Sequence, residues 1–111
     1  MNTRHRGKWY TRLSLQDGDT VVEIGCGTGF NFGLLREAVG ASGKIIGVDA
    51  TDAMLAQAGR RVQNHDWSNV DLVLSDARSF RFPERAAGVL STYALSIIPN
   101  AQDVLERGER E

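Results

Sequence analysis

The sequence predicts an α/β protein built on a doubly wound parallel sheet, and three observations predict it. Short, β-branched apolar runs alternate along the chain with segments whose apolar residues recur at helical spacing. These runs are too apolar for strands that keep one face in water. A glycine-rich loop follows the first run and opens a helix. Such an alternation is satisfied by parallel strands joined through right-handed crossovers, with about four strands in this chain.

The expected elements follow one another as strand, helix, strand, helix, strand and strand. We expect strands over residues 20–24, 44–48, 69–74 and 86–93, and helices over 30–38 and 51–62. Gly40 supplies the stop of the first helix, and Thr51 is the expected N-cap of the second. A basic amphipathic helix is predicted over 1–16, and Asn100 is expected to cap a last charged helix.

Length and composition bound the class of protein. The chain has 111 residues, 41% hydrophobic and 24% charged, which is typical of an ordinary soluble domain. We expect a single domain over 1–111, made of the N-terminal helix (1–16), a ligand-binding core (17–99) and the charged terminal helix (100–111). The net charge of -1 excludes bulk nucleic-acid binding through a basic field. Cys26, the single cysteine, excludes an internal disulfide, and the absence of a secretory signal predicts a cytoplasmic location.

The glycine loop carries most of the functional prediction. Gly25, Gly27 and Gly29 let the backbone approach a ligand and present its amides without a Cβ in the way. A dinucleotide fingerprint requires glycine or alanine at the sixth position, where this chain has Phe30 or Phe32, both too large for close packing of helix on strand. A P-loop requires a lysine followed by serine or threonine, which is missing here. Nucleotide or NAD binding is therefore disfavoured.

Four blocks of sequence resemble the Rossmann-like (class I) S-adenosylmethionine-dependent methyltransferases. Residues 22–29 resemble the first motif of that family, 47–55 the acidic motif of its second strand, and 73–77 its third motif. Residues 91–99 are similar to the fourth-strand segment of its small-molecule and lipid-type members. The blocks occur in the family's order and span most of the chain.

The resemblance implies S-adenosylmethionine as cofactor and S-adenosylhomocysteine as product. Asp49, about 20 residues beyond the loop, is placed to accept both ribose hydroxyls, and Met54 is suited to stack on the adenine. By the family's pattern, Asp76 and Ala77 would contact the adenine edge and Glu23 would brace the loop. The predicted cofactor-binding residues are Glu23, Gly25, Cys26, Gly27, Gly29, Asp49, Ala50, Met54, Asp76, Ala77 and Tyr93.

Simpler interpretations stand beside these. Cys26 is either a nucleophile or a packing residue, and the absence of a nearby histidine favours packing. Asp49 alone is a helix-entry carboxylate and Asp76 alone a turn-former, but their joint position at two strand ends favours a ligand. No catalytic side chain is assigned, because a sulfonium is already a good leaving group and positioning suffices. No metal is assigned either, since His5 and His65 lack ligand spacing.

The resemblance also predicts what completes the sheet and what the protein does. Full members of the family continue beyond the fourth strand, so the sheet here is expected to be truncated, in the order 3-2-1-4, with its fourth strand at a bare edge. We therefore expect a homodimer that covers this edge. The basic segment 1–16 either contacts a membrane or an anionic substrate, or forms a solvated helix face. The predicted activity is methyl transfer to a small-molecule or lipid-like acceptor; the alternative is a cofactor-binding module without turnover.

Overall fold

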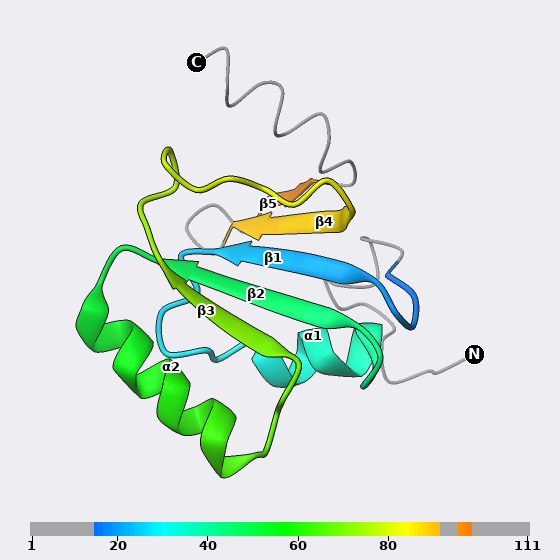
Figure 1. The fold of residues 1–111 in the computed structure, drawn as a ribbon, viewed down its shortest axis with the longest axis horizontal. Coiled ribbons are helices and arrows are strands. Elements are labelled where there is room, and N and C mark those ends of the chain that lie inside the picture. Colours follow the sequence, from blue (N-terminus) through cyan, green and yellow to red (C-terminus); the bar gives the residue numbers. More distant parts are fainter. Residues whose placement is uncertain (1–14, 92–95, 99–111) are drawn as a thin grey trace.

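The computed structural model describes residues 15–91 and 96–98, which form a five-stranded sheet with two helices. The order of the strands is β3-β2-β1-β4-β5 (Figure 1). Strands β1 to β4 run parallel, as predicted, whereas β5 runs antiparallel to β4. The elements are β1 (Thr20–Ile24), α1 (Phe32–Val39), β2 (Lys44–Asp49), α2 (Asp52–Asn64), β3 (Val70–Leu74), β4 (Ala86–Ser91) and β5 (Ser96–Ile98).

Strand β5 overturns the expectation that the fourth strand ends the sheet as a bare edge. Val89 pairs with Ile98, and Ser91 pairs with Ser96. Of the predicted fourth strand, 86–93, residues 86–91 form β4 and the last two lie outside the described residues, and β5 returns along β4. A three-residue strand is too short to show a period of its own, which is why the sequence pattern did not reveal it. The expected terminal helix lies outside the described residues, as does most of the N-terminal one, whose last residues, 15 and 16, are not helical.

Both helices cover the same face of the sheet (Figure 1). The core on that face joins Val21 and Ile45 from the strands to Leu35 and Val39 of α1 and Leu55 of α2. Helix α1 ends where predicted, because Gly40 adopts a φ of 73° and donates its amide to the carbonyl of Arg36 at 2.7 Å. Among the described residues, no helix is long and apolar enough to cross a membrane.

Phe32 packs in a way that differs from the prediction made from the sequence. Phe32 is the first residue of α1, and its ring is completely buried in the core on the helix side of the sheet, although it was expected to be too large for close packing of helix on strand. The space comes from two glycines, because a Cβ atom at either Gly29 or Gly47 would lie 2.6 Å from the ring. A dinucleotide fingerprint excludes a large side chain at this position of the helix. Here the ring fits, because Gly47 on β2 has no side chain. Phe30, by contrast, is 78% exposed.

The opposite face of the sheet is covered by the segment between β3 and β4. Phe80 and Phe82 meet edge to face, with ring centroids 5.1 Å apart, and pack against the buried residues of that face. These buried residues are Val22, Ile24, Val48 and Val89. In the described part of the chain, the second face therefore carries a non-helical strap, and the helices lie only on the first.

Candidate functional site

The glycine loop leaves the carboxyl end of β1 with three glycines at positive φ. The values are 74° for Gly25, 57° for Gly27 and 83° for Gly29. Their surroundings differ: a Cβ at Gly29 would strike Phe32, whereas a Cβ at Gly27 would meet no atom of the described residues within 4 Å. Gly29 thus serves the core, and Gly27 presents bare backbone to open space, as a ligand contact requires.

Most amides of the loop are already bonded inside the protein. Gly25 and Cys26 both donate to the carbonyl of Val48, at 2.7 and 3.0 Å. Gly27 donates to the Oδ2 atom of Asp49 at 2.8 Å, and Gly29 donates to the carbonyl of Cys26 at 3.0 Å. The amides of Gly25, Gly27 and Gly29, which were expected to face a ligand, are thus hydrogen-bonded within the chain, as is that of Cys26. They fix the shape of the loop and do not form a cradle for an anion.

Asp49 connects the loop to the entry of α2. Its side chain is 6% exposed at the end of β2. Besides the bond from Gly27, its Oδ1 atom accepts the amide of Thr51 at 2.9 Å. Thr51 is the N-cap, as predicted, although its side chain makes no capping bond. A carboxylate has about four lone-pair sites, so Asp49 is a helix-entry residue that retains acceptor capacity.

A second buried carboxylate lies at the neighbouring strand end. Glu23 of β1 is 1% exposed, and its Oε2 atom accepts a hydrogen bond from the side-chain amide of Asn31 at 2.8 Å. Asn31 is the residue before α1, so Glu23 ties the far side of the glycine loop to the strand. Sequence reasoning did not single out Asn31, because it lay inside the helix predicted over 30–38, which begins at Phe32 in the structure.

Cys26 is a packing residue, as the absence of a partner histidine indicated. The thiol is 4% exposed and belongs to the core under the helices. Burial, followed by the charges of Glu23 and Asp49, raises the pKa of the Cys26 thiol to about 12. The thiol is therefore protonated at neutral pH and is no nucleophile. Only the backbone of Cys26 is left to contact a ligand.

Asp76 follows the end of β3 and is exposed. Its carboxylate accepts the amide of Ser79 at 2.7 Å and the hydroxyl of Ser79 at 3.3 Å. These bonds lower the pKa of the Asp76 carboxyl below its ordinary value. Asp76 thus stabilises the turn that follows β3, and its contact with a ligand stays a prediction. Ala50 and Ala77 are also exposed, and Tyr93 lies outside the described residues.

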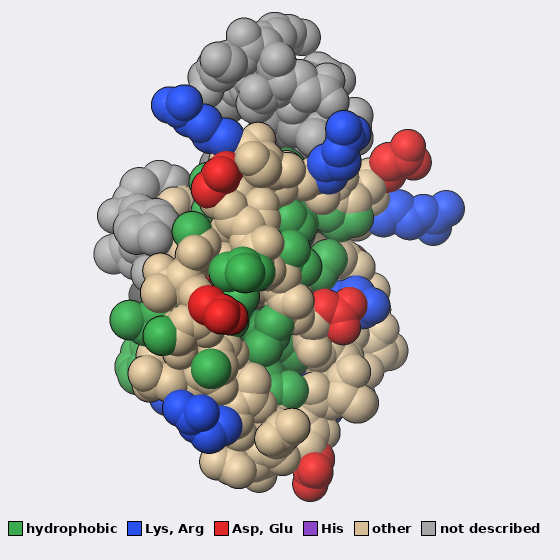
Figure 2. Space-filling model, turned by 60° about the vertical axis from the view of Figure 1, so that its left-hand side comes forward, with side chains coloured by type: hydrophobic (Ala, Val, Ile, Leu, Met, Phe, Trp, Pro, Cys, Tyr) green, Lys and Arg blue, Asp and Glu red, His purple; other side chains and the backbone are tan. Residues whose placement is uncertain are grey.

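Large exposed hydrophobic side chains occur around the same edge of the sheet. Met54 in the first turn of α2 is 40% exposed, Leu74 at the end of β3 is 57% exposed, and Phe30 follows the loop. Figure 2 turns the side that bears the strand carboxyl ends forward and shows hydrophobic side chains gathered there with acidic ones between them. Of the three, the sequence singled out only Met54 as a ligand contact. Leu74 and Phe30 were missed, because exposure is a property of the fold.

Helix α2 also touches the loop directly. The Nε atom of Arg61 donates to the carbonyl of Thr28 at 3.2 Å, across 33 residues of sequence. The loop is therefore held in three places. Val48 and Asp49 of β2 accept its amides. Glu23 of β1 binds Asn31 at the end of the loop, and Arg61 of α2 binds the carbonyl of Thr28. This bracing leaves the outer side of Gly27 open.

The strand order, the glycine loop after β1 and the acidic residue ending β2 define a Rossmann-like α/β protein of the class I methyltransferase type. Residues 21–110 match the family described as the methyltransferase domain, and the chain belongs to this family. Over 96 residues it is 32% identical to a demethylmenaquinone methyltransferase of Oceanobacillus iheyensis, covering 86% of this chain and 40% of the relative. It is 31% identical over 91 residues to an aklanonic acid methyltransferase of Streptomyces sp. (strain C5), covering 81% of this chain and 41% of that one.

Solved structures show the same fold. A SAM-dependent methyltransferase from Aquifex aeolicus superposes with a TM-score of 0.71 at 24% identity, covering 86% of this chain and 55% of its own. The chain spans about two fifths of the length of the curated relatives described above, 40% and 41%.

Proposed function

We propose that this chain binds S-adenosylmethionine and that the protein to which it belongs transfers the methyl group to a small-molecule acceptor. One observation carries the proposal: the buried carboxylate of Asp49 is bonded to the amide of Gly27, whose outer side faces open space. Bare backbone and an acceptor-only carboxylate thus meet at the carboxyl ends of β1 and β2, where ligands bind in sheets of this kind.

The charge of the site favours a cationic cofactor over a dinucleotide. Glu23 and Asp49 place two buried carboxyl groups at the base of the loop. A pyrophosphate needs free amides and a positive field, and the amides of Gly25, Cys26, Gly27 and Gly29 are occupied. A sulfonium and an ammonium group are stabilised by nearby carboxylates instead. The occupied amides and the two carboxylates disfavour NAD more firmly than the size of Phe32 does.

The proposed roles of the predicted residues follow their positions. Asp49 would accept the ribose hydroxyls with its remaining lone pairs, and Gly27 would allow the backbone to approach. Met54 would stack on the adenine, with Asp76 and Ala77 at its edge. Glu23 would act by holding the loop through Asn31. Gly25, Cys26 and Gly29 would contribute the shape of the loop, and Ala50 and Tyr93 remain predicted contacts.

In the reaction, these residues bind and orient. When bound, S-adenosylmethionine supplies a methyl group on a sulfonium. No side chain of the site needs to attack the cofactor, and the Cys26 thiol is protonated and buried. The contribution proposed for this chain is to hold the methyl group in line with the acceptor atom, an effect of orientation.

The acceptor is proposed as a small molecule. The relatives described above are named for demethylmenaquinone and aklanonic acid. The exposed apolar side chains of Phe30, Met54 and Leu74 near the strand ends support an organic ligand beside the loop. A lipid-like acceptor is the more specific form of this proposal.

Two measurements test the function. Calorimetric titration with S-adenosylhomocysteine should show saturable binding that is tighter than the binding of NAD. Transfer of a labelled methyl group to a panel of quinones, phenols and other small organic acceptors should follow. Tighter binding of NAD would refute the cofactor. Binding of S-adenosylhomocysteine without transfer to any acceptor would favour the alternative of a binding module.

Assembly and location stay predictions. We propose a homodimer whose contact lies at β5, because β5 and not β4 is the edge on that side among the described strands. The three residues of β5 offer a short template for pairing, and sedimentation over a range of concentrations tests for the dimer.

A cytoplasmic location is testable by fractionation of cells. Membrane contact by segment 1–16 is testable by flotation with anionic vesicles.

A further inference from the structure

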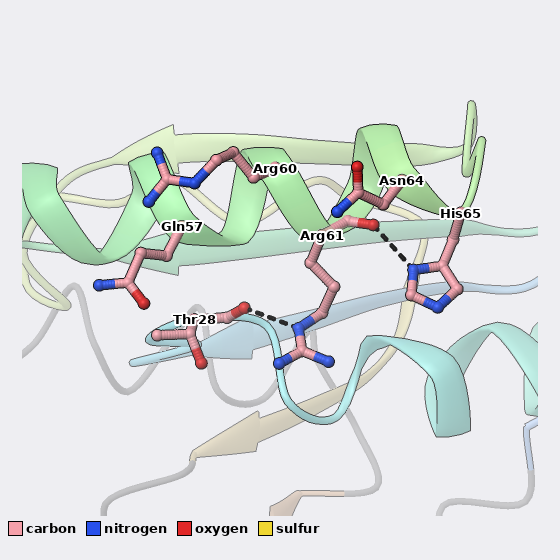
Figure 3. Close-up of a pocket in the computed structure, with 6 residues that line it drawn as sticks. All are labelled: Thr28, Gln57, Arg60, Arg61, Asn64 and His65. Carbon is pink, nitrogen blue, oxygen red and sulfur yellow. Dashed lines mark hydrogen bonds between the residues drawn. The ribbon is translucent and has the colours of Figure 1, made fainter.

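A polar cleft lies between the glycine loop and α2, separate from the carboxylates at the strand ends. Its volume is about 350 Å³. Thr28 contributes from the loop, and every other lining residue belongs to α2 or its C-cap (Figure 3). These residues recur at spacings of three and four, which puts them on one face of the helix. They are Gln57, Arg60, Arg61, Asn64 and His65.

The charges of the cleft have one sign. Arg60 and Arg61 are cationic, and none of the described residues that line the cleft carries a carboxylate. Arg61 uses its Nε atom for the carbonyl of Thr28. In the described part of the chain, the Nη atoms of Arg61 have no hydrogen bond or ion pair, and neither has the guanidinium group of Arg60. The amides of Gln57 and Asn64 add further donors to the lining of the cleft.

We propose that this cleft is a binding site for a phosphoryl group, either inorganic phosphate or the phosphate of a small molecule. Guanidinium groups bind such oxyanions through paired N–H donors, and amide side chains complete the set. Helix α2 also fixes the site, because the Arg61 side chain is anchored at Nε and presents its remaining donors in a constrained orientation. The whole chain carries a net charge of -1, so this patch is a local concentration of positive charge.

Calorimetric titration with inorganic phosphate and with glycerol 3-phosphate tests the proposal, with ionic strength held constant by chloride. We expect saturable binding, weakened about tenfold or more by Arg60→Gln, since a charge-assisted bond is lost. Arg61→Gln should weaken it at least as much. Arg81→Gln is the matched control, because Arg81 is an exposed arginine on the segment between β3 and β4. Thermal unfolding of each variant checks that it folds.

The outcomes separate the proposal from its rivals. Amide resonances of Thr28 and of residues 57–65 should shift on addition of phosphate, and those of the strand ends should not. Saturable binding of inorganic phosphate or of glycerol 3-phosphate supports the site. The ligand that binds more tightly identifies the source of the phosphoryl group. Absence of saturable binding, equal weakening by Arg81→Gln, or tighter binding of a duplex oligonucleotide through the same arginines would overturn it. These titrations contain no cofactor, so their result is independent of S-adenosylmethionine binding, and Arg60→Gln should leave the affinity for S-adenosylhomocysteine unchanged.

Discussion

The ring of Phe32 occupies the place where a side chain on Gly47 would stand. A Cβ atom at Gly47 would lie 2.6 Å from the Cζ atom of Phe32 and 3.1 Å from the sulfur of Cys26. Both neighbours are buried, so neither can move aside into solvent. The contact sets the distance between α1 and β2, and the glycine loop is the segment that joins β1 to α1.

Gly47→Ala is therefore expected to destabilise the fold. Overpacking of a tight core costs about 1–3 kcal/mol, which should appear as a lower free energy of unfolding in a denaturant titration. Gly33→Ala is the control. Gly33 lies on helix α1, and a Cβ atom there would meet the Trp67 side chain at an ordinary contact distance of 3.6 Å. Equal stability of the two variants would show that Phe32 can relocate.

Gly27→Ala and Gly29→Ala should fail in different ways. Both residues have positive φ, so both substitutions carry backbone strain of about 1–2 kcal/mol. Gly29→Ala adds a clash with Phe32, whereas a Cβ at Gly27 enters open space. We expect Gly29→Ala to lose more stability, and Gly27→Ala to lose more affinity for S-adenosylhomocysteine relative to its stability. Calorimetry and thermal unfolding measure the two. Parallel losses in both variants would leave Gly27 without a ligand contact.

Asp49→Asn tests the carboxylate at the end of β2. The substitution keeps the size of the side chain but removes the charge and one acceptor, so the bonds to Gly27 and Thr51 cannot both remain. Loss of one charge-assisted bond to the ribose is worth about 1.5–3 kcal/mol, or roughly tenfold or more in affinity for S-adenosylhomocysteine. Asp71→Asn, which removes an exposed carboxylate bonded to Lys44, should leave the affinity unchanged. Unchanged affinity in Asp49→Asn would reduce Asp49 to a helix-entry residue.

The parts of the fold that the sequence predicted are those fixed by local pattern. Strand β1 has the predicted bounds, because its β-branched run is bounded by a turn and a glycine loop. The position of Asp49 beside the loop also followed, since the ends of adjacent parallel strands meet at one edge. Strand β5 and the strap with Phe80 and Phe82 did not follow, because neither has a periodic pattern.

The hydrogen bonds of the loop lay beyond sequence reasoning for a different reason. That Val48 accepts two loop amides depends on the register of β1 against β2, which pairs Ile24 with Val48. Glycines alone show where backbone can approach a ligand, but they do not show which amides remain available. The bond from Arg61 to Thr28 depends in the same way on how α2 lies against the loop.

The buried thiol of Cys26 gives the fold a dependence on alkaline pH. Its pKa is raised from 9.0 to about 12 in the folded chain, chiefly by burial and then by Glu23 and Asp49. Between these two values the unfolded chain loses the proton while the folded chain keeps it. The stability that this group contributes is therefore complete below pH 9.0 and is lost as the pH rises towards about 12.

We expect the free energy of unfolding to fall more steeply above pH 9.0 in the wild-type chain than in Cys26→Ala. Denaturant titrations at a series of pH values measure the difference, and comparing the two chains removes the titration of tyrosines and lysines that both share. Alkylation of the folded wild-type chain by iodoacetamide at neutral pH should be slow, because the reagent requires an exposed thiolate. Rapid alkylation without unfolding, or identical pH profiles of the two chains, would contradict a protonated thiol sealed in the core.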